Sequence, residues 1–122
     1  MNVHLRIGLA LLAAMVLVGC GPVSIRTAPA AAQACDEALL AGSLERQAQT
    51  GLGVGTSDLV VTPVQWPFGY RARMDIDKVV LVDETGSVVA REHDRVEVGG
   101  GMGAGDVWFA CGPVKVVSNE AG

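Results

Sequence analysis

An apolar segment of twelve residues near the start of the chain, Ile7 to Val18, most limits what this sequence can fold into. It follows a short positively charged stretch that contains Arg6. The segment is too short to cross about 30 Å of hydrocarbon, which needs about twenty residues. A positive stretch followed by such a run is typical of a secretory signal peptide. We therefore expect residues 1–19 to be a leader, which leaves room for one small domain.

The four residues that end this region, Leu17-Val18-Gly19-Cys20, resemble a lipobox, the cleavage motif of bacterial lipoprotein precursors. The resemblance implies that the Cys20 thiol receives a diacylglyceryl group and that cleavage makes Cys20 the new N-terminus. Two acyl chains, such as palmitate, give stable anchoring where a single chain gives marginal binding. The expected location is the extracytoplasmic side of a cell membrane. The alternative is an ordinary signal peptide in which Cys20 falls at this position by chance.

The residues that follow, Gly21 to Ala34, contain two prolines and several alanines without an amphipathic pattern. Such a composition is typical of a flexible linker. We expect residues 20–34 to form a disordered tether with a reach of about 20 Å. The domain should then occupy residues 35–117, and residues 118–122 should form a disordered tail.

Two cysteines, Cys35 and Cys111, remain once Cys20 is assigned to lipid. An even number of cysteines in an exported protein predicts a disulfide bond. The alternative is two free buried thiols, and a metal site is disfavoured because no further His or Cys stands at ligand spacing. The bond would link the start of the domain to its last strands.

Valine-rich runs, sixteen glycines and few aromatic residues favour short strands joined by tight turns. The predicted strands are 59–64, 78–82, 87–91, 95–98, 107–111 and 113–117, the last at a sheet edge. Alternation in 95–98 should bury its valines, and Phe109 and Cys111 should share the inward face of their strand. The segment Asp83 to Gly86 predicts a hairpin turn with Gly86 at positive φ.

The segment Asp36 to Gln49 is ambiguous, because Leu40, Leu44 and Ala48 fit one face of a helix while Gly42 interrupts it. We favour a short helical turn followed by a strand from Gly42 to about Gln47.

The segment Gly86 to Val96 resembles the strand, turn and strand of small β-barrels, including OB-like ones. The whole domain is also similar to small secreted proteins of high-GC bacteria. The expected fold is all-β: a small barrel or OB-like barrel of about six to seven short strands, preceded by a signal helix and a disordered tether. His93 stands where the turn usually has glycine, which predicts a left-handed backbone there. No ligand or activity follows from the resemblance.

The formal charge of −4 becomes −5 once the leader, with Arg6 and no acid, is removed. A mildly acidic protein lacks the electrostatic signature of nucleic-acid binding, so no nucleic-acid partner is expected. The sequence also shows no basic patch for anionic lipids.

Three parts of the sequence resemble catalytic, cofactor or metal sites, but for each of them we favour a structural role. The run from Gly99 to Gly105 lacks the helix that a dinucleotide fingerprint requires, so we predict a flexible hairpin loop. His93 has no nucleophile tied to it by motif, so we predict a solvated turn residue. The acids Asp58, Asp75 and Asp77 form only the beginning of a calcium loop. We expect no metal and no cofactor.

The segment from Val64 to Arg73 concentrates aromatic and arginine residues, which are the usual material of binding sites. The candidate binding residues are Trp66, Phe68, Tyr70, Arg71 and Arg73. Prolines and glycine indicate a loop or bulged turn here. The alternative is that Trp66 and Phe68 cap one end of the barrel, since a small domain needs its few aromatics for its core.

These observations together favour a non-catalytic module, attached to the membrane through lipid on Cys20, that binds an envelope protein or glycan. The opposing hypothesis is a small envelope hydrolase or metal-dependent enzyme that uses His93 with Asp94 or Asp75. A third interpretation is a purely structural envelope component.

Overall fold

The computed structural model describes residues 21–57 and 59–117, and this part of the chain is almost entirely β-structure. The predicted all-β class is therefore confirmed, although ten strands form where six to seven were expected. A short 3-10 turn, η2 (Ala104–Asp106), precedes β9. The strands are β1 (Pro22–Val23), β2 (Ala38–Gln47), β3 (Gly51–Ser57), β4 (Val60–Gln65), β5 (Arg71–Asp75), β6 (Lys78–Val82), β7 (Val88–Arg91), β8 (Arg95–Met102), β9 (Trp108–Ala110) and β10 (Lys115–Val116).

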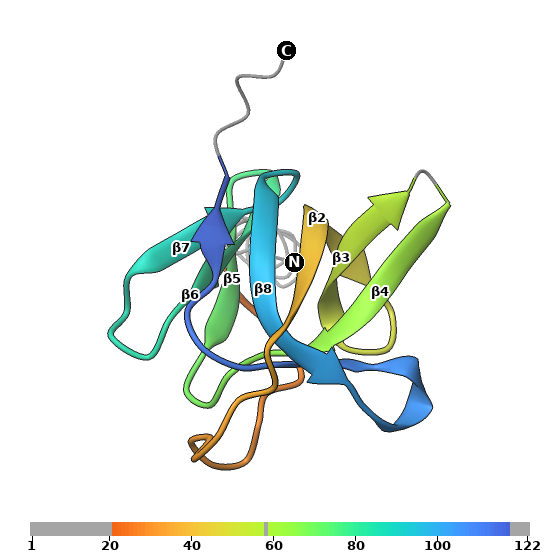
Figure 1. Ribbon diagram of the computed structural model, residues 1–122. Helices are drawn as coiled ribbons and strands as arrows, with labels where there is room; N and C mark the ends of the chain where they lie inside the picture. Colours follow the sequence, from red (N-terminus) through yellow and green to blue (C-terminus); the bar gives the residue numbers. More distant parts are fainter. Residues whose placement is uncertain (1–20, 58, 118–122) are drawn as a thin grey trace, which may run out of the picture.

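Five strands close into a barrel in the order β8-β2-β3-β4-β9, and pairing between β8 and β9 completes the ring (Figure 1). All neighbours are antiparallel except β4 and β9, which run parallel. A closed ring leaves none of its five strands with an open edge of its own. This confirms the predicted small barrel, and five is also the strand number of OB-like barrels.

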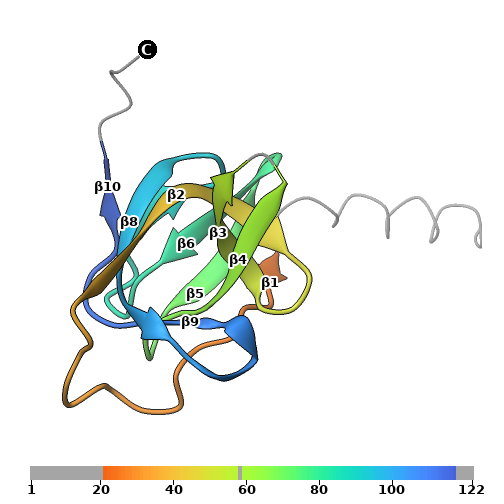
Figure 2. The same cartoon turned by 45° about the vertical axis from the view of Figure 1, so that its right-hand side comes forward.

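A second sheet with the order β1-β5-β6-β7 packs beside the barrel (Figure 2). Its β6–β7 hairpin turns at residues 83–87, with Gly86 at φ 89° as predicted. Strand β10 pairs with β8 of the barrel and extends the barrel sheet to six strands, with β10 at its edge. The expected edge strand near the C-terminus is therefore also confirmed.

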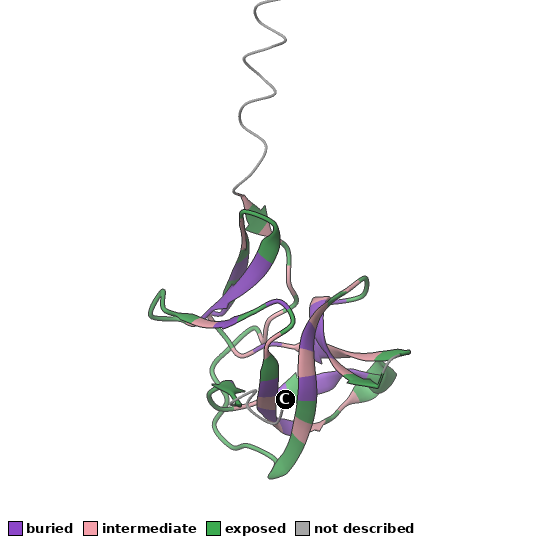
Figure 3. Ribbon diagram, turned by 90° about the horizontal axis from the view of Figure 1, so that it is seen from above, coloured by how far each residue is buried: buried purple, intermediate pink, exposed green. Residues whose placement is uncertain are grey.

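The core lies between the barrel strands and the inner face of the second sheet, where buried segments alternate with exposed ones (Figure 3). Val96 and Val98 of β8 are buried, as the alternation predicts. Trp108 and Ala110 of β9 are buried while Phe109 is partly exposed, so the prediction that Phe109 faces inward is wrong. Successive side chains of a strand point to opposite faces, so the burial of Trp108 and Ala110 turns Phe109 outward.

The glycine-rich run 99–105 is not simply a loop, because β8 continues through it to Met102. Gly100 has a φ of 143°, and a side chain there would collide with the Phe109 carbonyl. Gly100 pairs with both Ala38 of β2 and Ala110 of β9. The glycine therefore lets β8 bend where the barrel closes, which is a structural use of a residue without Cβ.

The expected helical turn after Asp36 is replaced by strand, since β2 already begins at Ala38. Pairing with β8 from Ala38 to Ser43 outweighs the weak helical pattern of this segment. Strand β3, in the glycine-rich segment 51–57, was not predicted.

Residues 21–28 are not the free tether that we expected. Strand β1 pairs with β5, and the Arg26 N–H donates to the Thr50 carbonyl at 2.9 Å. Ala28 and Trp66 are joined by a further backbone hydrogen bond of 2.8 Å. Proline and alanine are compatible with an edge strand, and these backbone groups find partners on the domain. Cys20, the leader and the tail 118–122 lie outside the described residues.

Cys35 and Cys111 form the predicted disulfide, with their Cα atoms 5.5 Å apart. The bond joins the segment before β2 to the residue that follows β9. Within residues 21–57 and 59–117, no helix is long and apolar enough to span a bilayer.

Candidate functional site

The aromatic segment separates into core and surface residues. Trp66 is 0% exposed, and its indole N–H donates to the Leu52 carbonyl at 3.1 Å. Tyr70 is 7% exposed, whereas Phe68 is 52% exposed. Trp66 and Tyr70 fill the core of a domain that has few large side chains, which for Trp66 agrees with the alternative of a role in the core. Among the three aromatic residues of this segment, Phe68 is therefore the one that a partner can reach.

Phe68 lies in a hollow of about 460 Å³ beside the disulfide. The other apolar residues around it are Ala28, Ala31, Ala32, Pro67, Tyr70, Val89, Ala110 and Pro113. Two acidic residues of the β6–β7 turn, Asp83 and Glu84, stand on the same hollow. An aromatic side chain thus shares a concave surface with carboxylates.

Asp83 on the rim of this hollow is charged at neutral pH. The Thr85 hydroxyl donates to Asp83 Oδ1 at 2.6 Å and is the main reason that the pKa of Asp83 falls below its ordinary value of 3.8. The backbone N–H groups of Thr85 and Ser87 donate to the same oxygen at 2.9 and 3.1 Å. These bonds fix the Asp83 carboxylate in the turn, while Glu84 stays exposed.

The Tyr70 phenol stays neutral in this setting. Burial raises its pKa above the ordinary value of 10.0, and a hydrogen bond with the Val114 backbone acts in the opposite direction. The negative charges of Glu84 and Asp83 raise the pKa further. Tyr70 therefore contributes an uncharged aromatic ring to the hollow.

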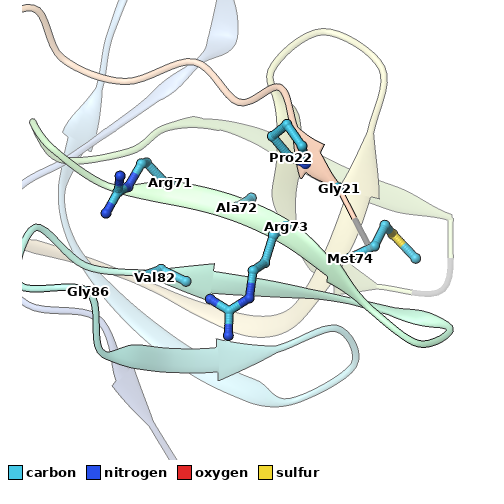
Figure 4. Close-up of a pocket in the computed structure, with 8 residues that line it drawn as sticks. All are labelled: Gly21, Pro22, Arg71, Ala72, Arg73, Met74, Val82 and Gly86. Carbon is cyan, nitrogen blue, oxygen red and sulfur yellow. The ribbon is translucent and has the colours of Figure 1, made fainter. Parts of the chain in front are cut away.

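Arg71 and Arg73 lie elsewhere, on the outer side of the second sheet. They line a separate hollow of about 490 Å³ together with Gly21, Pro22 and Val82 (Figure 4). Ala72, between them on β5, points into the core. The five candidate binding residues thus divide among the core, the Phe68 hollow and the outer face of β5, because alternation along β5 turns the arginines away from the aromatic residues.

His93 has the predicted left-handed backbone, with a φ of 76°. Its Nδ1 lies 2.9 Å from Glu45 Oε2, and its Nε2 lies 3.7 Å from Glu92 Oε2. The side chain is 59% exposed. Within the described part of the chain, no hydroxyl or thiol is hydrogen-bonded to His93, so a carboxylate partner is present without an aligned nucleophile.

The carboxylates that we named as partners of His93 are engaged elsewhere. Asp94 Oδ2 accepts the Arg91 N–H at 2.9 Å, and Asp75 pairs with the Arg91 guanidinium at 2.8 Å. The residues that do approach His93 are Glu45 of β2 and Glu92 of the turn between β7 and β8, and neither was singled out from the sequence as its partner. Glu45 and His93 are 48 positions apart in the sequence, so no local sequence pattern predicts their contact.

Glu92 is the most buried charged residue described, at 8% exposure. Its Oε1 accepts the Val79 N–H at 3.0 Å and lies 3.0 Å from Arg46 Nη2. Burial alone would raise the pKa of Glu92, but these two hydrogen-bond donors and the positive charges of Arg46 and His93 hold it below the ordinary value of 4.5. Glu92 therefore fastens β6 of the second sheet to β2 of the barrel as an ionised group.

No cluster of three or more His, Cys, Asp or Glu suited to a metal ion occurs in residues 21–57 and 59–117. Asp75 is paired with Arg91, and Asp58 lies outside the described residues.

Comparison of the chain with protein-family models, with curated proteins and with solved structures finds no match.

Proposed function

We propose that this chain is the precursor of a bacterial lipoprotein, held by lipid on Cys20 to the extracytoplasmic side of a cell membrane. Its β-domain is a non-catalytic module that binds an envelope protein or glycan. The observation that carries the binding role is the exposed Phe68 ring in a hollow that also contains the acidic residues Asp83 and Glu84.

The chemistry of this hollow fits a partner with an apolar or planar face and nearby donors. An exposed aromatic ring packs against the face of a sugar ring or an aliphatic side chain, while Asp83 and Glu84 accept hydrogen bonds or attract positive charge. Both amino-sugar polymers and basic peptide segments have this combination. The disulfide between Cys35 and Cys111 is consistent with an oxidising compartment outside the cytoplasm.

The second candidate is an envelope hydrolase, which the 2.9 Å contact between His93 and Glu45 favours. A carboxylate that orients a histidine is half of a nucleophile-activating arrangement. Without an aligned hydroxyl or thiol in the described residues, the binding module remains the better-supported function.

The anchor is tested by labelling cells with radioactive palmitate. We expect label in the wild-type protein and none in Cys20→Ala, because the thiol is the acceptor. Mass spectrometry of the mature protein should find an acylated Cys20 at its N-terminus. Equal labelling of both proteins would refute the anchor.

The binding role is tested by co-sedimentation with purified peptidoglycan and by cross-linking to envelope proteins in intact cells. Phe68→Ala should weaken capture about tenfold or more, since exposed aromatic anchors dominate binding energies. The matched control is Ile76→Ala, an 82% exposed apolar side chain in the β5–β6 turn, away from the hollow. Equal capture by wild type and Phe68→Ala would contradict the assignment.

A further inference from the structure

The outer side of the second sheet carries a row of arginines that is not apparent in the sequence. Arg73 of β5, Val80 of β6 and Arg91 of β7 are successive partners in the strand register, so their side chains share one face. Arg71 and Val82 form the next pair on this face. We call the surface of these five residues the arginine face.

The centre of this face is apolar and buried. Val80 is 0% exposed and Val82 is 5% exposed, although neither belongs to the core cluster on the other side of the sheet. Flanking arginines bury such residues with their aliphatic stems while the guanidinium groups stay in water. Figure 4 shows Arg71 and Arg73 extending from β5, with Arg73 reaching towards Val82 on β6. The strand register therefore places Arg71 and Arg73 beside two buried valines.

The charge of this face contrasts with that of the whole domain. Arg91 is paired with Asp75 at 2.8 Å, but neither Arg71 nor Arg73 has an ion pair among residues 21–57 and 59–117. Lys78 adds a further positive charge, since it is the register partner of Asp75 at the end of the same two strands. A chain with an overall charge of −4 thus presents a cationic surface on one side.

The chain enters the domain beside this surface. The Gly21 carbonyl accepts the Met74 N–H at 2.9 Å, and Pro22 is the register partner of Arg73. Successive Cα atoms are about 3.8 Å apart, so whatever is attached to residue 20 begins next to β5. The hollow of about 490 Å³ between Gly21, Arg71 and Arg73 opens at this point (Figure 4).

We propose that the arginine face lies against the membrane and binds the phosphate groups of anionic phospholipids. This inference rests on the proposed anchoring through Cys20. The lipid would hold Gly21 at the bilayer surface, and the paired strand β1 leaves the domain little freedom to turn away. The rest of the acidic domain is repelled by anionic lipid, so the arginine face is the surface that turns towards it. Guanidinium groups without ion-pair partners bind phosphate well.

The test is a footprinting experiment on the wild-type acylated protein, which avoids variants that fail to fold. The protein is inserted into vesicles of phosphatidylcholine alone or with about 30% phosphatidylglycerol and treated with the arginine reagent phenylglyoxal. Modified residues are identified by mass spectrometry. In the anionic vesicles Arg71 and Arg73 should react with phenylglyoxal at least about fivefold more slowly, because the attraction of one arginine to such a surface corresponds to about a fivefold change in binding. Arg95, exposed on β8 of the barrel, is the internal control and should react equally in both.

Salt and free phosphate identify the source of any protection. About 1 M NaCl should restore reactivity, because it reduces the screening length to about 3 Å. Protection of the same arginines by inorganic phosphate in phosphatidylcholine vesicles would assign the face to a soluble anion and overturn the membrane contact.

The two proposals fail in different ways. If the protein is acylated and sediments with vesicles while Arg71 and Arg73 react equally in both lipids, the arginine face is overturned and the anchor stands. If the protein carries no acyl group and does not sediment, the anchor fails and the inference that rests on it fails as well.

Discussion

Replacing Glu92 by alanine should reveal how the second sheet is attached to the barrel. Glu92 stands in the turn between β7 and β8, and its carboxylate joins the Val79 N–H of β6 to Arg46 of β2. The substitution removes the acceptor for a buried N–H and the partner of an arginine. Because these contacts differ in burial, their contributions to stability should differ.

The magnitude follows from that difference in burial. Val79 is 2% exposed, and a buried donor left without a partner costs about 1–3 kcal/mol. The Arg46 side chain is 54% exposed, so its ion pair contributes at most about 1 kcal/mol. We expect Glu92→Ala to lower the free energy of unfolding by about 2–3 kcal/mol and Arg46→Ala by about 1 kcal/mol. Glu92→Gln, which keeps one side-chain oxygen for Val79, should fall between them.

The assay is urea unfolding of the oxidised protein, followed by the fluorescence of the buried residues Trp66 and Trp108. Arg46→Ala and Glu92→Ala should be compared at the same pH and ionic strength. Equal losses in these two variants would show that the exposed ion pair, and not the buried Val79 N–H, holds the two sheets together. That result would refute the reasoning.

Two further perturbations test other parts of the fold. Hydrogen bonds and positive charge lower the pKa of Glu92, so the contribution of its carboxylate to the free energy of unfolding is complete above pH 4.5 and is lost as the pH falls through the lowered pKa. Urea unfolding at a series of acidic pH values should show this loss in the wild type and not in Glu92→Gln. Replacing both Cys35 and Cys111 by serine opens a loop with a sequence separation of 76 and should cost about 4 kcal/mol, measured by urea unfolding of the variant against the wild type under oxidising conditions. A loss below about 1 kcal/mol would show that the ends of the domain are held by strand pairing alone.

Local patterns predicted much of this fold. The alternation of valines with charged residues identified the buried face of β8, and turn residues identified the β6–β7 hairpin. The even number of cysteines that remain after Cys20 identified the disulfide. Each of these signals depends on residues close in sequence or on a simple count. The pattern in β9 was misread because Phe109 and Cys111 are as apolar as Trp108 and Ala110, so polarity alone does not assign the inward face.

The remaining errors concern contacts between distant segments. Residues 21–28 have the composition of a linker, and only their pairing with β5 and Trp66 shows that they belong to the domain. The sequence left open whether Trp66 binds a partner or fills the core, and only its hydrogen bond to a carbonyl 14 positions away inside the barrel decides for the core. The arginine face likewise requires the register of three strands. Tertiary pairing decides all three, and a single sequence carries little information on it.

Ring closure by β8 and β9 has a kinetic consequence. The hairpins β2–β3, β3–β4 and β5–β6 join neighbours in sequence, whereas β2 meets β8 through pairs such as Ala38 with Gly100. A chain whose decisive contacts span such distances folds slowly, on the order of milliseconds to seconds. Until the residues up to Ala110 have been synthesised, β2 and β4 each lack the strand that pairs with one of their edges. The barrel of a nascent chain therefore cannot close until most of the sequence has left the ribosome.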